Sequence, residues 1–179
     1  MDRIEQTIRR RDNELQKKDK FKYNLMMALA AGFSLFAIYS LITAFMIFAN
    51  AAMSVTIFDV LPLIVSVLLT IIFFTKKDDM IVEYDYIVED DVFIIAKIKN
   101  LKSRKEIVNV PVSSFKRIDN YNAENFKSLD IKKINCSLND DSEKYVLTFE
   151  RGEKCAVVFE PNEELLQMII KYFHLSVHH

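Results

Sequence analysis

Glycine is almost absent from this chain of 179 residues, since only Gly32 and Gly152 occur. Phosphate-binding loops, dinucleotide-binding turns and the sharp turn that carries a hydrolase nucleophile all need closely spaced glycines. The backbone in those motifs adopts conformations, or approaches a ligand, in ways that a side chain would block. The sequence therefore excludes these nucleotide-binding and hydrolase motifs.

Cysteine and histidine are scarce as well. Cys136 and Cys155 cannot form a disulfide framework, and each falls in an apolar run that predicts a buried strand position. The three histidines, His174, His178 and His179, all lie in the last six residues. A terminal tail explains them more simply than a metal site, and none lies where it could activate a Cys or Ser nucleophile. We therefore expect no catalytic residue, no metal site, no cofactor and no enzymatic activity.

Charge is missing from two long stretches, and these organise the chain. Residues 23–49 carry no charged side chain, and residues 60–75 carry none either, with Asp59 just before them. A membrane-spanning helix needs roughly 17–25 mostly apolar residues. The sequence thus predicts a transmembrane hairpin over 23–75, with the second span beginning near 55. Two core helices of a soluble protein are the alternative, but such helices are seldom apolar on every face.

Basic residues flank the outer ends of this hairpin. Residues 1–22 contain eight basic and five acidic side chains, whereas the connection 50–54 contains neither Lys nor Arg. The positive-inside bias then places both chain ends in the cytoplasm. The flanking cations are Arg9, Arg10, Arg11, Lys76 and Lys77. We expect the segment 1–22 to be helical; it either continues into the first span, lies on the membrane surface or frays as a solvated tail.

Small residues form a stripe along the predicted spans. They are Ala30, Ala37, Ser40 and Ala44 in the first span and Ser66 and Thr70 in the second. Small side chains let helices approach closely, so these residues are expected to pack the two spans together. Alternatively, they assemble several copies of the chain into a transport or pore complex.

From residue 80 the hydrophobic period changes to two. It predicts seven short strands over 82–88, 92–99, 105–112, 113–120, 131–138, 144–150 and 154–159, the last two joined by a tight turn at Arg151-Gly152. A helix follows from Asn162, which is expected to cap its N-terminus, to about His174. A meander of the last three strands would place Cys136 and Cys155 two strands apart. The expected fold class is an α+β membrane protein. Its hairpin would carry a cytoplasmic, seven-stranded antiparallel barrel or sandwich over 76–179, capped by the C-terminal helix.

The opening Met1-Asp2, the stretch 82–88 (VEYDYIV), the basic stretch 102–105 and the stretch 159–164 (FEPNEE) carry a family resemblance. The chain resembles a family of small bacterial two-span membrane proteins, mostly from Gram-positive anaerobes, that is catalogued as a domain of unknown function. The resemblance implies a layout, that of a two-span protein of the bacterial inner membrane, rather than an activity. The element order of the C-terminal part is that of a pleckstrin-homology-like (PH-like) barrel.

Five basic residues gather on the predicted second strand and the turn after it: Lys97, Lys99, Lys102, Arg104 and Lys105. We expect them on the solvent side, with Ile94, Ala96 and Ile98 facing the core. A solvated strand face is one interpretation, and a patch for an anionic lipid headgroup or an acidic protein is the other. Glu83 and Asp85 are expected to be solvated, and the acidic loop 89–91 argues against phosphoinositide binding of the pleckstrin-homology type.

These features favour a non-catalytic, membrane-anchored binding or scaffold module that contacts a protein partner or a second copy of itself. A subunit of a transport or pore assembly is the first alternative, and recognition of an anionic lipid is the second. The formal net charge of −1 gives no support to nucleic-acid binding.

Overall fold

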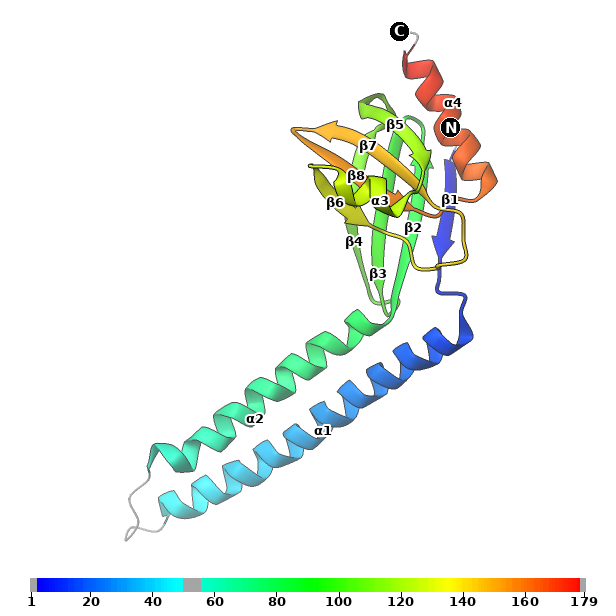
Figure 1. Cartoon of the computed structure of the whole chain (residues 1–179). Coiled ribbons are helices and arrows are strands. Elements are labelled where there is room, and N and C mark those ends of the chain that lie inside the picture. The colour runs from blue at the N-terminus through cyan, green and yellow to red at the C-terminus, as the bar shows by residue number, and fades with distance from the viewer. Residues whose placement is uncertain (1–2, 50–55, 178–179) are drawn as a thin grey trace. The chain divides into compact units, whose positions relative to one another are not determined.

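The computed structural model of the protein describes residues 3–49 and 56–177. The chain divides into two compact units (Figure 1). One unit combines Met1–Asn13 with Val82–His179 and is called the β-domain below. The other, Glu14–Ile81, is called the hairpin. The hairpin is thus an insertion in the sequence of the β-domain.

The hairpin consists of two long helices and one short one: α1 (Asn13–Ala49), α2 (Ile57–Lys76) and the 3-10 helix η1 (Lys77–Met80). Both long helices have the length and composition to cross a membrane. Only 11% and 6% of their most apolar windows are buried. A core helix of a soluble protein would bury most of its apolar surface. The two long helices are as apolar as core helices, but they are far less buried. The connection 50–54, with Val55, lies outside the described residues.

The small-residue stripe lies between the two helices. Ala30, Ser40 and Ser66 are buried, and Ala37, Ala44 and Thr70 are half-buried. Buried and half-buried positions recur along α1 at alternating intervals of three and four, from Tyr23 to Ile47. This spacing is the seam of an antiparallel helix pair, and the rings of Phe33 and Phe73 stack across it at 5.7 Å.

The N-terminal segment corrects the prediction of a helix over 1–22. Arg3–Ile8 forms strand β1, which pairs antiparallel with β2 from Arg3↔Glu89 to Ile8↔Tyr84. Ile4 and Ile8 fit a helical and an alternating pattern equally well, and the partner strand that decides between them is distant in sequence. The helix α1 begins at Asn13 and continues through the first apolar run without a break.

The β-domain contains two four-stranded sheets in its described part, where seven antiparallel strands were predicted. Sheet 1 has the order β1-β2-β3-β4, and sheet 2 has the order β5-β7-β8-β6. The remaining elements are β2 (Val82–Glu89), β3 (Val92–Lys99), β4 (Ser103–Pro111), η2 (Val112–Ser114), β5 (Phe115–Asn120), α3 (Ala123–Ser128), β6 (Lys132–Asn135), β7 (Tyr145–Arg151), β8 (Glu153–Phe159) and α4 (Glu163–Val177).

The last three strands do not form a meander, and the prediction that all strands are antiparallel is wrong. β6 pairs parallel with β8, and β7 lies on the other side of β8. The chain from β6 to β7 must therefore cross the end of β8 instead of turning back beside β6. A local pattern cannot reveal this order, because the strand between β6 and β7 comes later in the sequence. The turn from β7 to β8 was predicted correctly, and Gly152 adopts its left-handed conformation (φ 73°).

The two sheets pack against each other around an aromatic core. The ring centroid of Phe93 in sheet 1 lies 5.5 Å from that of Phe159 and 5.8 Å from that of Phe115, both in sheet 2. Leu165 and Ile169 of α4 are fully buried against this core. The side chain of Asn162 caps α4 by accepting from the N–H of Leu165 at 2.9 Å, as the sequence predicted. A smaller cluster, with Phe126 of α3, covers the outer face of sheet 2.

Candidate functional site

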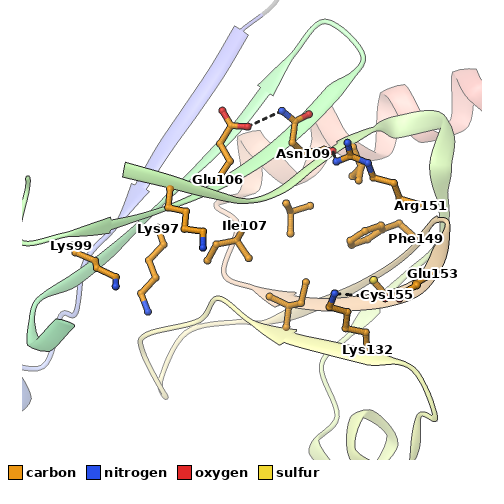
Figure 2. A pocket seen from close by; sticks show the side chains of 14 residues that line it. Lys97, Lys99, Glu106, Ile107, Asn109, Lys132, Phe149, Arg151, Glu153 and Cys155 are labelled. Atoms are coloured by element: carbon orange, nitrogen blue, oxygen red, sulfur yellow. Dashed lines mark hydrogen bonds and ion pairs between the residues drawn. The ribbon is translucent and has the colours of Figure 1, made fainter. Parts of the chain in front are cut away.

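A cavity of about 580 Å³ lies between the two sheets of the β-domain (Figure 2). Its volume falls within the range of roughly 300–1,000 Å³ that ligand pockets occupy. It opens where both sheets end, because β4 is the last strand of sheet 1 and β6 is the last strand of sheet 2. Its walls come from β3 and β4 on one side and from β6, β7 and β8 on the other.

Three lysines of the predicted basic set line this cavity: Lys97, Lys99 and Lys105. Their orientation corrects the sequence prediction. Phe93 and Ile95 are fully buried in the core, and alternation along β3 puts Lys97 and Lys99 on the same side as these two residues. The lysines thus continue the inner face of β3 beyond the point where the apolar core ends, and Figure 2 shows both directed toward the space between the sheets.

Lys97 and Lys105 are direct cross-strand partners in the β3–β4 register. Like charges at directly opposed positions destabilise a sheet. In the part of the chain that the structure describes, neither ammonium group has a carboxylate within ion-pair distance. The two acidic side chains that line the cavity are engaged elsewhere: Glu153 pairs with Lys132 at 3.6 Å, and Glu106 accepts from Asn109 at 2.8 Å. Within the described residues, Lys97 and Lys105 thus carry positive charge that no carboxylate compensates.

The far end of the cavity is closed by a contact between the sheets. Arg151 of β7 donates from Nη1 to the carbonyl oxygen of Asn109 in β4 at 2.6 Å. Between this contact and the lysines the lining is apolar. It consists of Ile107, Val108, Val110, Ile134, Phe149 and Cys155. The cavity is therefore amphipathic, with an apolar floor and a cationic end.

Both cysteines lie near this floor. Cys136 is fully buried, and burial raises the pKa of its thiol to about 12, although the nearby Lys97 acts in the opposite direction. Cys136 is therefore a neutral thiol at physiological pH. Cys155 is directly in the cavity lining. The two are separated because Cys155 pairs with Lys132 at the start of β6, whereas Cys136 follows Asn135 at its end.

The other members of the predicted basic set do not line the cavity. Arg104 lies 3.6 Å from Asp85 on the other face of sheet 1, and Lys102 lies in the exposed β3–β4 turn. Asp85 is 4% exposed and also accepts from the hydroxyl of Thr7 at 2.7 Å. The prediction that Asp85 is solvated is therefore wrong. Glu83 is likewise partly buried and pairs with Arg9 at 3.0 Å.

Of the predicted juxtamembrane cations, some are exposed and others are buried or half-buried. Lys76 is exposed and lies 3.8 Å from Asp79. Lys77 is 3% exposed, with its ammonium group 4.1 Å from the ring centroid of Phe74, and so is not a solvent-facing cation. Arg10 is half-buried, and the backbone N–H of Arg11 donates to the side chain of Asn139 at 2.7 Å.

That contact belongs to a buried network that the sequence did not reveal. Glu160, at the end of β8, is 3% exposed. Its carboxylate accepts from the backbone N–H of Leu138, from that of Asn139 at 2.8 Å and from Nδ2 of Asn139 at 2.9 Å. Glu160 therefore fastens the segment that crosses from β6 to β7. The FEPNEE stretch carried the family resemblance, and no spacing rule marks its first glutamate as buried.

The same network holds the N-terminal segment in place. Nδ2 of Asn139 also donates to the carbonyl oxygen of Arg9 at 3.2 Å. The hydroxyl of Tyr86 donates to the carbonyl oxygen of Cys136 at 2.8 Å and accepts from the N–H of Glu160 at 3.3 Å. The residues just before the hairpin and the strand just after it are thus joined to one buried centre.

No cluster of three or more His, Cys, Asp and Glu side chains within residues 3–49 and 56–177 could hold a metal ion. The side chain of His174, and both His178 and His179, fall outside what the structure describes.

Two packed sheets followed by a C-terminal helix are the arrangement of a PH-like domain, here with two long apolar helices inserted after its first strand. The chain belongs to the family described as "Bacterial PH-like domain (DUF6106)", a family of unknown function whose model matches residues 5–179. This confirms the resemblance seen in the sequence. The match includes both apolar helices, so the hairpin is part of the family pattern. No curated protein and no solved structure matches the chain.

Proposed function

We propose that this chain is a non-catalytic binding module that its hairpin anchors in the bacterial cell membrane. The observation that supports this most directly is the exposure of α1 and α2. Only 11% of the most apolar window of the first helix is buried, and only 6% of that of the second. Apolar surface of this extent needs a lipid or protein environment.

The β1–β2 pairing supports an even number of membrane crossings. β1 precedes α1, β2 follows α2, and the two strands pair in register within one sheet. The chain must therefore return to the side from which it entered. Together with the basic residues before the first span, this favours a cytoplasmic β-domain and cytoplasmic chain ends.

The cavity supports the binding role. It offers an apolar floor beside Lys97 and Lys105, which have no carboxylate partner among the described residues, and this is the arrangement of a recognition site. A membrane anchor raises the local concentration of such a site toward any partner at the bilayer, so a weak contact suffices. We propose that the partner is a protein.

The alternative of a transport or pore subunit uses the small-residue stripe between copies of the chain. In the structure Ala30, Ser40 and Ser66 are already buried within one hairpin. The alternative of a lipid-binding patch uses all five cations together, whereas Arg104 pairs with Asp85 on the opposite face from Lys97. Both observations favour the binding-module proposal.

The proposal is tested by locating the protein and its ends in cells. We expect the full chain to need detergent for extraction, and a reporter fused after His179 to report the cytoplasm, whereas a reporter inserted into the connection 50–54 reports the outside. Extraction without detergent, or an external reporter at the C-terminus, would refute the anchored topology. Ion or solute flux that Ala37→Leu abolishes would instead establish the transport role.

A further inference from the structure

The most informative feature of the cavity is how β4 contributes to it. Six consecutive residues of this strand, 105–110, line the cavity. Successive residues of a strand point to opposite faces except at a bulge, and the β3–β4 register shifts between Glu106 and Val108, so Ile107 is an extra residue there. The cavity still touches residues of both faces, such as Val108 and Asn109, and therefore lies along the open edge of the strand. Because β4 is the last strand of sheet 1, this edge carries backbone N–H and C=O groups without a strand partner in the described residues.

We propose that this edge binds an extended acidic peptide segment of a partner protein, which pairs with β4 as an added strand. This inference rests on the proposed binding function and names its site and its ligand chemistry. The backbone of the added strand would hydrogen-bond to β4, as in other cases of β-strand addition. Every second side chain of the peptide would face the floor formed by Val108, Phe149 and Cys155.

The charges of the cavity set the sign of the ligand. Lys97 and Lys105 oppose each other without a carboxylate, and Lys99 lines the same end. An inward-facing Glu or Asp side chain of the added strand would lie beside Lys105, on the side away from Lys97, and would offset part of their mutual repulsion. A basic peptide would increase it. The complementary ligand is therefore acidic at the end that meets the lysines and apolar in its next inward-facing position.

The geometry also limits the length of the segment. Asn109 already uses its carbonyl oxygen to accept from Arg151, so an added strand must end before this contact. The stretch from Lys105 to Val108 remains, and at about 3.3 Å per residue it accommodates an extended segment of about four residues. A segment this short binds weakly by itself, which is compatible with a module whose anchor supplies local concentration.

The test uses the full chain in nanodiscs of zwitterionic phosphatidylcholine and a short fluorescent peptide, Glu-Ser-Val-Ser, which places glutamate and valine at successive positions on the same face of an extended strand. We expect saturable binding that Lys97→Glu with Lys105→Glu weakens by roughly tenfold or more, because two close charge pairs become repulsive. The matched control is Lys116→Glu with Lys127→Glu. It changes the net charge equally on β5 and α3, away from the cavity. Correct folding of both variants is checked by hydrogen exchange in β8.

A second comparison separates strand addition from charge attraction alone. An N-methylated form of the peptide keeps its charge but loses alternate backbone donors, and we expect it to bind at least several-fold more weakly. Binding of the unmodified peptide should also slow hydrogen exchange in residues 105–108. Equal affinity for both peptides, or no change in exchange there, would overturn the proposal.

The remaining outcomes are equally decisive. If vesicles containing phosphatidylglycerol displace the peptide and N-methylation has no effect, the cavity takes an anionic lipid and the proposal is wrong. If the peptide does not bind while a specific protein partner binds the chain equally well with and without the two lysine reversals, this site is wrong but the binding function stands. If the anchored topology fails, the proposed function fails first.

Discussion

The hairpin and the β-domain satisfy their buried polar groups in opposite ways. In the hairpin, the buried Ser66 donates to the carbonyl oxygen of Pro62 at 2.8 Å, four residues earlier in the same helix. In the β-domain, Glu160 accepts from Asn139, 21 residues away, and Asn139 in turn contacts Arg9, 130 residues away. In the membrane location proposed for the hairpin, no water reaches a buried polar group, so each helix must satisfy its own polar groups. In the β-domain, in contrast, the buried polar groups of this network form hydrogen bonds only when segments distant in the sequence come together.

This difference predicts where single substitutions will matter. A change in the buried network of the β-domain leaves several distant groups unpaired at once, and the loss is shared by the whole domain. The same kind of change within one hairpin helix affects one local bond. The predictions below test this contrast, from the largest expected effect to the smallest.

Glu160→Gln should have the largest effect. The amide would direct a donor at Nδ2 of Asn139, and Asn139 cannot rotate its side chain to compensate, because its oxygen accepts from Arg11 and its nitrogen donates to Arg9. Hydrogen bonds to a buried charged group contribute about 1.5–3 kcal/mol each, so we expect a loss of about 2–4 kcal/mol in the free energy of unfolding. Hydrogen exchange of β8 amides measures it.

The control for this substitution is Glu163→Gln, which makes the same chemical change at an exposed position in the first turn of α4. It should cost less than about 1 kcal/mol, the upper range for a charge at a helix N-terminus. Equal losses in the two variants would mean that the buried network does not hold the crossing segment, and the contrast between the two units would fail.

Alkaline pH should destabilise the β-domain next most strongly. Burial raises the pKa of Cys136 to about 12 from an ordinary value of 9.0, and burial together with the charge of Cys136 raises the pKa of Tyr84 to about 12 from 10.0. The folded state therefore holds these protons more tightly than the unfolded state. Stability is complete below about pH 9 and falls as the pH rises toward 12. Cys136 alone should account for about 1–2 kcal/mol at about pH 10.

Urea midpoints at several pH values, followed by near-ultraviolet circular dichroism, measure this loss. In Cys136→Ala the first part of the decline, between about pH 9 and 10, should flatten, because the group that titrates there in the unfolded chain is gone. A decline in Cys136→Ala as steep as in the unchanged protein would show that the buried thiol does not carry it.

The same contrast explains what could be predicted from the sequence. The two long apolar helices, the paired strands β2–β3 and β7–β8, and the Asn162 cap follow from neighbouring residues. Strand β1 does not, because its helical or extended state depends on β2. The inner face of β3 could not be assigned either. Ile94 and Ile95 are both apolar, and only the packing of sheet 2 decides that Ile95 faces the core.

Only one wall of the cavity could be predicted, because only its residues are close together in the sequence. Lys97, Lys99 and Lys105 stand close together in the sequence and could be grouped. The opposite wall comes from β6, β7 and β8, and no pattern in the sequence brings Phe149 and Lys132 to the same place. The parallel pairing of β6 with β8 creates that wall, and this pairing was the part of the topology that local alternation missed.

Tyr86→Phe tests the buried network with a smaller change. The ring of Tyr86 is fully buried and packs edge-on against Phe159 at 5.8 Å, and the substitution retains this contact. It removes the hydroxyl that joins Cys136 to Glu160, which should cost about 1–2 kcal/mol. Tyr84→Phe is the control, because its hydroxyl lies 3.5 Å from the carbonyl oxygen of Asn135, at the limit of a hydrogen bond. Its loss, measured by the same urea midpoints, should be smaller.

Ser66→Ala in the hairpin should have the smallest effect, although Ser66 is 1% exposed. Its hydroxyl donates only within α2, to the carbonyl oxygens of Pro62 and Leu63. These carbonyls also accept backbone bonds in the helix, so removal of the hydroxyl leaves no buried donor unpaired. We expect a change of less than about 0.5 kcal/mol, near the small average for side-chain hydrogen bonds within membranes. Thr75→Ala removes the same kind of bond, from Thr75 to Ile71, at an exposed position and should change stability by a similar amount. Unfolding of the full chain in mixed detergent micelles, followed by helical circular dichroism, compares the two variants. A much larger loss for Ser66→Ala would mean that its hydroxyl also bonds to α1, and the hairpin would then depend on distant partners as the β-domain does.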